Sequence, residues 1–123
     1  MRQLSGMKTW LAASAMVVCA FAAQAQDVVG RYRVEGTNLD GSRYTGTAEV
    51  SALSNTTCTI RWNTGSTSSG ICMRQGDIFV AGYRMGEAIG LVVYRWRNGG
   101  EYLDGTWTVA GAKGVGTERL YPR

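Results

Sequence analysis

The stretch AIGLVVYRWRNGGEYLDGTWTV, residues 88–109, decides the fold of this chain. It contains two runs rich in β-branched and aromatic residues, which favour strands. The triplet Asn-Gly-Gly at 98–100 separates the runs and is typical of a hairpin turn, because these residues accept the backbone conformations that tight turns need. Arg97 and Glu101 would then face each other across the turn with opposite charges. The stretch therefore predicts a β-hairpin.

The same alternation of strand-forming runs and short turns continues in both directions from this hairpin. Glycine, asparagine, aspartate and serine mark the turns, the only proline is Pro122, and no helical period extends beyond a turn or two. Eight strands are predicted, at residues 28–37, 43–52, 57–63, 68–74, 77–84, 87–97, 101–110 and 115–121. Short links favour a meander, and closure would leave no exposed edge. We expect an all-β fold, an antiparallel up-and-down meander of about eight strands that forms a closed or nearly closed barrel.

Pairing opposite charges across the hairpin turns predicts which face of the sheet is buried. With turns at 75–76, 85–86 and 98–100, the aliphatic side chains of four strands align on one face. This predicted core comprises Ile71, Met73, Ile78, Val80, Ile89, Leu91, Val93, Leu103, Trp107 and Val109.

The opposite face of the same strands would carry aromatic and arginine side chains. These are Tyr94, Arg95, Trp96, Arg97 and Tyr102, with Trp96 directly across from Tyr102. Exposed aromatic rings beside arginines are typical of protein-binding hot spots, because they supply rigid contact area and forked donors. We predict that these five residues form a binding surface for a protein partner. The alternative is an aromatic pair that only stabilises its hairpin.

The first 25 residues have the pattern of a secretion signal. Arg2 and Lys8 precede an apolar run at 10–23, and Ala-Gln-Ala at 23–25 is a small-residue cleavage site. The apolar run is too short for a transmembrane anchor. We therefore predict a signal peptide at 1–25, a single barrel domain at 26–123, and a periplasmic or secreted protein.

Removal of the signal, which contains Cys19, leaves two cysteines. Cys58 and Cys72 would lie opposite each other on neighbouring strands, which predicts a structural disulfide worth about 3 kcal/mol. This pairing conflicts with the predicted core, because it places Ile60 and Trp62 on the face opposite Ile71. We expect a bulge at 66–69 to reset the alternation. The alternative is a polar interior lined by Thr59 and Arg61, with Trp62 outside.

Several functions are disfavoured by what the chain lacks. It has no histidine, the commonest general base and metal ligand, so we expect no catalytic residues, no metal site and no cofactor. Of the 13 Lys and Arg, Arg2 and Lys8 belong to the signal, so 11 remain against 9 Asp and Glu, a net charge of +2 (11 − 9). These charges are scattered, which predicts no nucleic-acid binding.

The leading expectation is thus an exported, non-enzymatic binding module, and two alternatives stay open. One is a small-molecule-binding barrel of the avidin or lipocalin type, whose cavity would be lined by Trp62, Tyr83 or Trp107. The other is a histidine-free enzyme that uses carboxylate and tyrosine side chains.

Four segments of the chain point to a known group of proteins: YRVEGTN at 32–38, SGICM at 69–73, AIGLVVY at 88–94 and GTWT at 105–108. With these segments the chain resembles a group of small exported proteins of Gram-negative bacteria that are labelled fibronectin-binding. This resemblance implies adhesion to an extracellular protein such as fibronectin. The strand count and the glycine-then-tryptophan strands are also similar to avidin-type barrels, which implies a small-molecule ligand.

Overall fold

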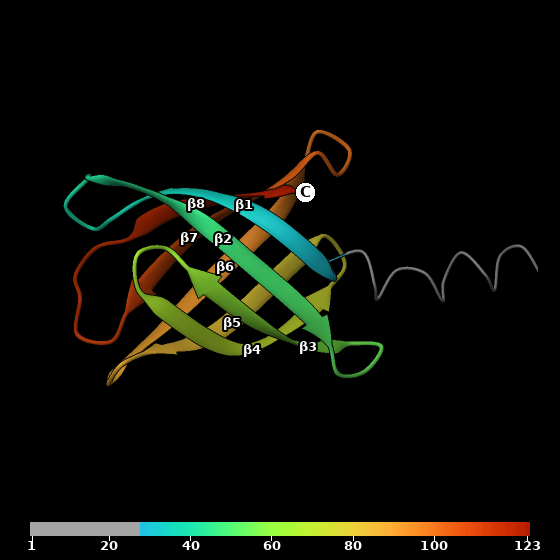
Figure 1. The fold of residues 1–123 in the computed structure, drawn as a ribbon, viewed down its shortest axis with the longest axis horizontal. Helices are drawn as coiled ribbons and strands as arrows, with labels where there is room; N and C mark the ends of the chain where they lie inside the picture. The colour runs from blue at the N-terminus through green and yellow to red at the C-terminus, as the bar shows by residue number, and fades with distance from the viewer. Residues whose placement is uncertain (1–27) are drawn as a thin grey trace, which may run out of the picture.

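The computed structural model describes residues 28–123, which form one closed barrel of eight antiparallel strands (Figure 1). The predicted signal peptide, residues 1–25, lies outside the described residues. The strands are β1 (Gly30–Thr37), β2 (Arg43–Ala52), β3 (Thr57–Asn63), β4 (Thr67–Gln75), β5 (Ile78–Met85), β6 (Ala88–Arg97), β7 (Tyr102–Val109) and β8 (Gly116–Pro122). Each strand pairs with its sequence neighbours, and β8 pairs with β1 to close the barrel. The predicted eight-stranded up-and-down barrel is confirmed.

The two ends of the barrel differ in what they carry. The turns β1–β2, β3–β4, β5–β6 and β7–β8 gather at one end, on the left of Figure 1, which we call the mouth. The other three turns lie at the opposite end, the far end, together with the C-terminus. In residues 28–123 no helix is long and apolar enough to cross a membrane.

The barrel interior is filled from alternate positions of all eight strands. Its buried side chains are Val28, Tyr32, Val34, Ala48, Val50, Cys58, Ile60, Trp62, Cys72, Phe79, Ala81, Val92, Tyr94, Leu103 and Leu120. Tyr44, Tyr83, Trp96 and Trp107 are partly buried and pack against them. Aromatic rings therefore make up much of the interior.

The structure places most of the predicted core residues on the outer face of the barrel. Ile71, Met73, Ile89, Leu91 and Val93 are exposed, Ile71 by 72% and Leu91 by 62%. Of the ten predicted core residues, Leu103 is fully buried, and Trp107 packs against the core.

The aliphatic residues of β4, β5 and β6 do share one face of the sheet, as predicted, but this face is the outer one and not the buried one. Val80 lies between Met73 and Val93 in the observed register, so these side chains do share one face. On β7 the register differs from the prediction by one residue, since Arg97 pairs with Tyr102 rather than Glu101. A shift of one residue exchanges the two faces of a strand, which is why Leu103 and Trp107 point inward while the aliphatic group lies outside.

The predicted disulfide between Cys58 and Cys72 is confirmed, with both side chains buried. The β3–β4 ladder runs unbroken from Asn63 paired with Thr67 to Thr57 paired with Met73, so the predicted bulge is wrong. The alternative is wrong as well, because Trp62 is buried. The conflict in the sequence is resolved by placing Ile71 and Met73 outside.

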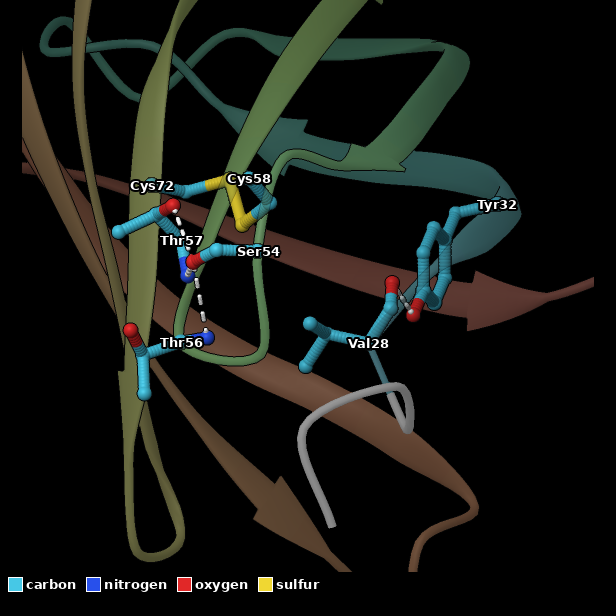
Figure 2. Close-up of a disulfide and its surroundings, with 7 residues drawn as sticks. All are labelled: Val28, Tyr32, Ser54, Thr56, Thr57, Cys58 and Cys72. Carbon is cyan, nitrogen blue, oxygen red and sulfur yellow. Dashed lines mark hydrogen bonds between the residues drawn. A yellow bond between two sulfur atoms is a disulfide. The ribbon is translucent and has the colours of Figure 1, made fainter. Parts of the chain in front are cut away.

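The disulfide lies at the far end of the barrel, beside the β2–β3 turn (Figure 2). In this turn the Ser54 hydroxyl oxygen accepts hydrogen bonds from the backbone N–H groups of Thr56 and Thr57. Val28 is buried just before β1, and its carbonyl accepts a 2.6 Å hydrogen bond from the Tyr32 hydroxyl. Figure 2 shows these contacts at the far end, where β1 begins.

Candidate ligand-binding cavity

A cavity of about 200 Å³ lies inside the mouth. Its lining residues are Asn38, Tyr44, Thr64, Ser66, Ser68, Trp62, Tyr83, Met85, Val92, Trp107 and Glu118. Asn38, Ser66 and Met85 are exposed residues at the turns and form the rim. Val92 and Glu118 are buried and form the floor. The cavity is therefore reached from the solvent through the mouth.

Four aromatic rings from four different strands form the walls. Tyr44 and Trp107 meet edge to face with ring centroids 6.3 Å apart, and Trp62 and Tyr83 do so at 5.3 Å. Such edge-to-face pairs are favourable because the positive edge of one ring meets the negative face of the other. Trp62, Tyr83 and Trp107 are the three residues predicted for the cavity of a small-molecule-binding barrel, and all three line it.

Three of these rings are positioned by glycines on the neighbouring strand. Each of the three glycines occupies an inward-facing position of its strand and lies directly opposite the aromatic residue in the strand register. The aromatic ring lies against the glycine backbone. A Cβ atom on the glycine would overlap the ring in every case, so only glycine fits. The pairs are Gly36 with Tyr44, Gly90 with Tyr83, and Gly116 with Trp107.

Glu118 is the one carboxylic acid among the described residues that line the cavity, and it is only 6% exposed. Its Oε1 accepts a 2.8 Å hydrogen bond from the Tyr44 hydroxyl. Its Oε2 accepts hydrogen bonds from the Trp62 indole N–H at 3.0 Å and from the Tyr94 hydroxyl. These three donors hold the carboxylate at the floor, on the inner side of β8.

The electrostatics of the cavity follow from this burial. Loss of solvent raises the pKa of Glu118, although the hydrogen bonds from Tyr94, Tyr44 and Trp62 oppose the change. Burial, together with the nearby Glu118 carboxylate, raises the pKa of Tyr83 to about 12. The same two causes raise the pKa of Tyr44 and Tyr94, so these hydroxyls remain protonated donors.

The predicted binding surface does not exist as one outward face. Tyr94 is 0% exposed and Trp96 packs against the core, because both lie on the inward side of β6 with Val92. Arg95 and Arg97 are exposed, as predicted. Trp96 instead borders a second hollow at the far end, together with Arg74, Asp77, Gly99 and Gly100.

The outward part of that surface joins side chains from β8 and β1. Tyr102 packs against Tyr121 with ring centroids 5.5 Å apart. The Arg119 guanidinium lies 4.8 Å from the Tyr102 ring centroid, and that of Arg33 lies 4.3 Å from the Tyr121 ring centroid. Protein binding by Arg95, Arg97 and Tyr102 stays a prediction.

Sequence reasoning missed Glu118 and Tyr44. The signal for Glu118 is its place on β8, where it alternates with Gly116 and Leu120 and so belongs to the apolar face. A charged residue on a buried face is unusual and would have marked it as a candidate. The signal for Tyr44 is its position across the first hairpin from Gly36.

No model of a known protein family matches the sequence, and no curated protein matches it. Several solved structures share the fold. A redesigned β-barrel superposes with a TM-score of 0.71 at 15% identity, covering 80% of this chain and 94% of its own. The redesigned barrel mFAP1, bound to DFHBI, gives 0.69 at 19% identity, covering 79% and 96%. A mutant of the fluorescent protein UnaG gives 0.54 at 12% identity, covering 81% and 99%. At these identities the likeness concerns the fold alone.

Proposed function

We propose that this chain is an exported, non-enzymatic barrel that binds a small molecule in the mouth cavity. The observation that carries the proposal is the cavity itself, with aromatic walls and one hydrogen-bonded carboxylate at its floor. Small-molecule sites are typically concave and largely apolar, with a few placed polar groups that orient the ligand. The cavity has this composition.

Two further observations support the proposal. Two barrels of the same fold, mFAP1 and EF1p2_mFAP2b, were solved bound to DFHBI, so barrels of this size accommodate a small ligand. The disulfide and the signal-like residues 1–25 favour export to the periplasm or beyond, because disulfides persist in oxidising compartments. Adhesion to fibronectin, which the family resemblance implies, is the alternative and would use the outer surface instead.

The proposal is tested by filling the cavity. Ser68 lines it, whereas the next residue, Ser69, is exposed on the outer face. Three single-ring probes, benzylamine, benzyl alcohol and benzoate, would be titrated into each protein, followed by calorimetry and tryptophan fluorescence. We expect at least one probe to bind the wild type saturably, and Ser68→Leu to weaken it by about tenfold or more.

The matched control is Ser69→Leu, which adds the same side chain outside the barrel and should leave affinity unchanged. Circular dichroism would show that both variants keep the strand content of the wild type. If no probe binds the wild type, or if Ser68→Leu binds as well as Ser69→Leu, the proposal is wrong.

A further inference from the structure

We infer that the ligand of the mouth cavity is a small organic cation, an ammonium group attached to a single ring, which would approach Glu118. This inference rests on the proposed function and names its ligand class. Three observations carry it: the charge at the floor, the aromatic walls and the size of the cavity.

The first observation is that the groups bonded to Glu118 leave its negative charge unbalanced. Tyr44, Tyr94 and Trp62 all donate hydrogen bonds to it, and all three are neutral. Burial raises the pKa of this carboxyl, and the three surrounding donors oppose that change because they stabilise the ionised form, which only accepts hydrogen bonds. A buried charge is costly unless an opposite charge accompanies it. Among the described residues that line the cavity none is Lys or Arg, so a ligand could supply the cation.

The carboxylate also has an acceptor position left for a ligand. Each carboxylate oxygen has two lone pairs. Oε2 accepts from both Trp62 and Tyr94, whereas Oε1 accepts from Tyr44 alone in the described structure. An ammonium N–H near Oε1 would complete the set and form a charge-assisted hydrogen bond, which is stronger than a neutral one.

The second observation is the chemistry of the walls. Tyr44, Trp62, Tyr83 and Trp107 surround the cavity, and the faces of tyrosine and tryptophan rings attract cations through their quadrupoles. The attraction grows when the cation is removed from water, as it would be here. An anionic ligand would instead meet the Glu118 carboxylate and would be repelled by it.

The third observation is size. Roughly 150 Å³ is enough to hold a benzene molecule in a protein cavity. The mouth cavity of about 200 Å³ therefore holds one ring and a short substituent, with the substituent directed to the floor. Peptides and larger ring systems would not fit inside it.

The three probes named above test the inference, since they differ mainly in the group attached to the ring. Benzylamine is a cation near neutral pH, benzyl alcohol is neutral and benzoate is an anion. We expect the wild type to bind benzylamine about tenfold or more tighter than benzyl alcohol, and benzoate weakest. This order needs no variant and is unaffected by any folding defect.

The second arm uses Glu118→Gln, which keeps the size of the side chain and removes its charge. It should weaken benzylamine binding by about tenfold or more and change benzyl alcohol binding by less than about threefold. The matched control is Glu87→Gln, in the exposed β5–β6 turn at the same end of the barrel, which should change neither affinity.

The outcomes separate the two proposals. If benzyl alcohol or benzoate binds as tightly as benzylamine, or if Glu118→Gln binds benzylamine like the wild type, the cation inference is wrong and the proposed binding function stands. If none of the three probes binds, both the inference and the proposed function fail.

Discussion

Two isoleucines test which face of the barrel is buried. Ile60 on β3 is 1% exposed, and Ile71 on β4 is 72% exposed. Ile→Ala removes three carbons, each worth about 0.8 kcal/mol when buried, or about 2.4 kcal/mol in all at the buried site. The cavity left behind adds to this, so we expect Ile60→Ala to cost about 3 to 4 kcal/mol.

The same substitution at the outer site should cost far less. Only about a quarter of the Ile71 side chain is shielded from water, so its transfer cost is about 0.7 kcal/mol. The loss of strand propensity is similar at both sites and cancels in the comparison. The two variants should differ by about 2 to 3 kcal/mol, or about 10 to 20 °C in Tm for a domain of this size.

The assay is urea unfolding followed by tryptophan fluorescence, with equal slopes required for the comparison. It would be repeated at two protein concentrations, because Ile71 belongs to an exposed aliphatic patch and self-association through that patch would make its stability depend on concentration. Equal losses for the two variants at low concentration, or a larger loss for Ile71→Ala, would refute the assignment of faces.

Three further predictions concern the floor, the far end and the glycines. Burial raises the pKa of Glu118 above its ordinary value of 4.5, so the folded state retains this proton longer than the unfolded state. The contribution of Glu118 to stability is therefore full below pH 4.5 and is lost as the pH rises through its pKa in the folded state. In urea unfolding measured over this pH range, Glu118→Gln should become more stable relative to the wild type as the pH rises. A difference between the two proteins that stays constant with pH would contradict this. Replacing Cys58 and Cys72 together by alanine should cost about 3 kcal/mol, because the bridge closes a short loop with a sequence separation of 14; a loss under about 1 kcal/mol by calorimetry would count against a structural role. Gly90→Ala should cost about 1 to 3 kcal/mol, since its Cβ would overlap an aromatic ring, whereas Gly82→Ala has room and serves as the control; equal unfolding midpoints would argue against the glycine–aromatic pairing.

The sequence was sufficient for the fold because its signals are local. Turn residues such as those at 98–100 punctuate strand-forming runs, and short links leave few topologies other than a meander. The facing positions of Cys58 and Cys72 also follow from one short hairpin. None of these inferences requires knowing which side of the sheet faces the interior.

The choice of the inner face could not be made in this way, because β6 is apolar on both sides. Ile89, Leu91 and Val93 alternate with Val92 and Tyr94, and alternation alone does not distinguish the two sets. The inner face is identified by contacts between residues that lie on different strands. The disulfide fixes the inner face of β3 and β4, and inward glycines paired with aromatic residues mark it on the other strands.

The candidate site was predictable only in part for the same reason. Trp62, Tyr83 and Trp107 were recognised as lining residues because tryptophan and tyrosine are plausible in any barrel cavity. Glu118 was not, since its inward position depends on the register of β8 against both β7 and β1, which the sequence does not give locally.

Glu118 is the strongest indication that the cavity serves a function. The interior around it is aromatic and aliphatic, and an apolar side chain of similar size would avoid the cost of burying a charge. Tyr44, Tyr94 and Trp62 lie on three different strands, and all three donate hydrogen bonds to this one carboxylate. The three donors meet at one point only because the barrel closes in this register. Natural sequences break the rule of an apolar core mostly where binding or chemistry requires it. A buried acid at the floor of an open, ring-lined cavity is such an exception, and the proposed ligand would account for it.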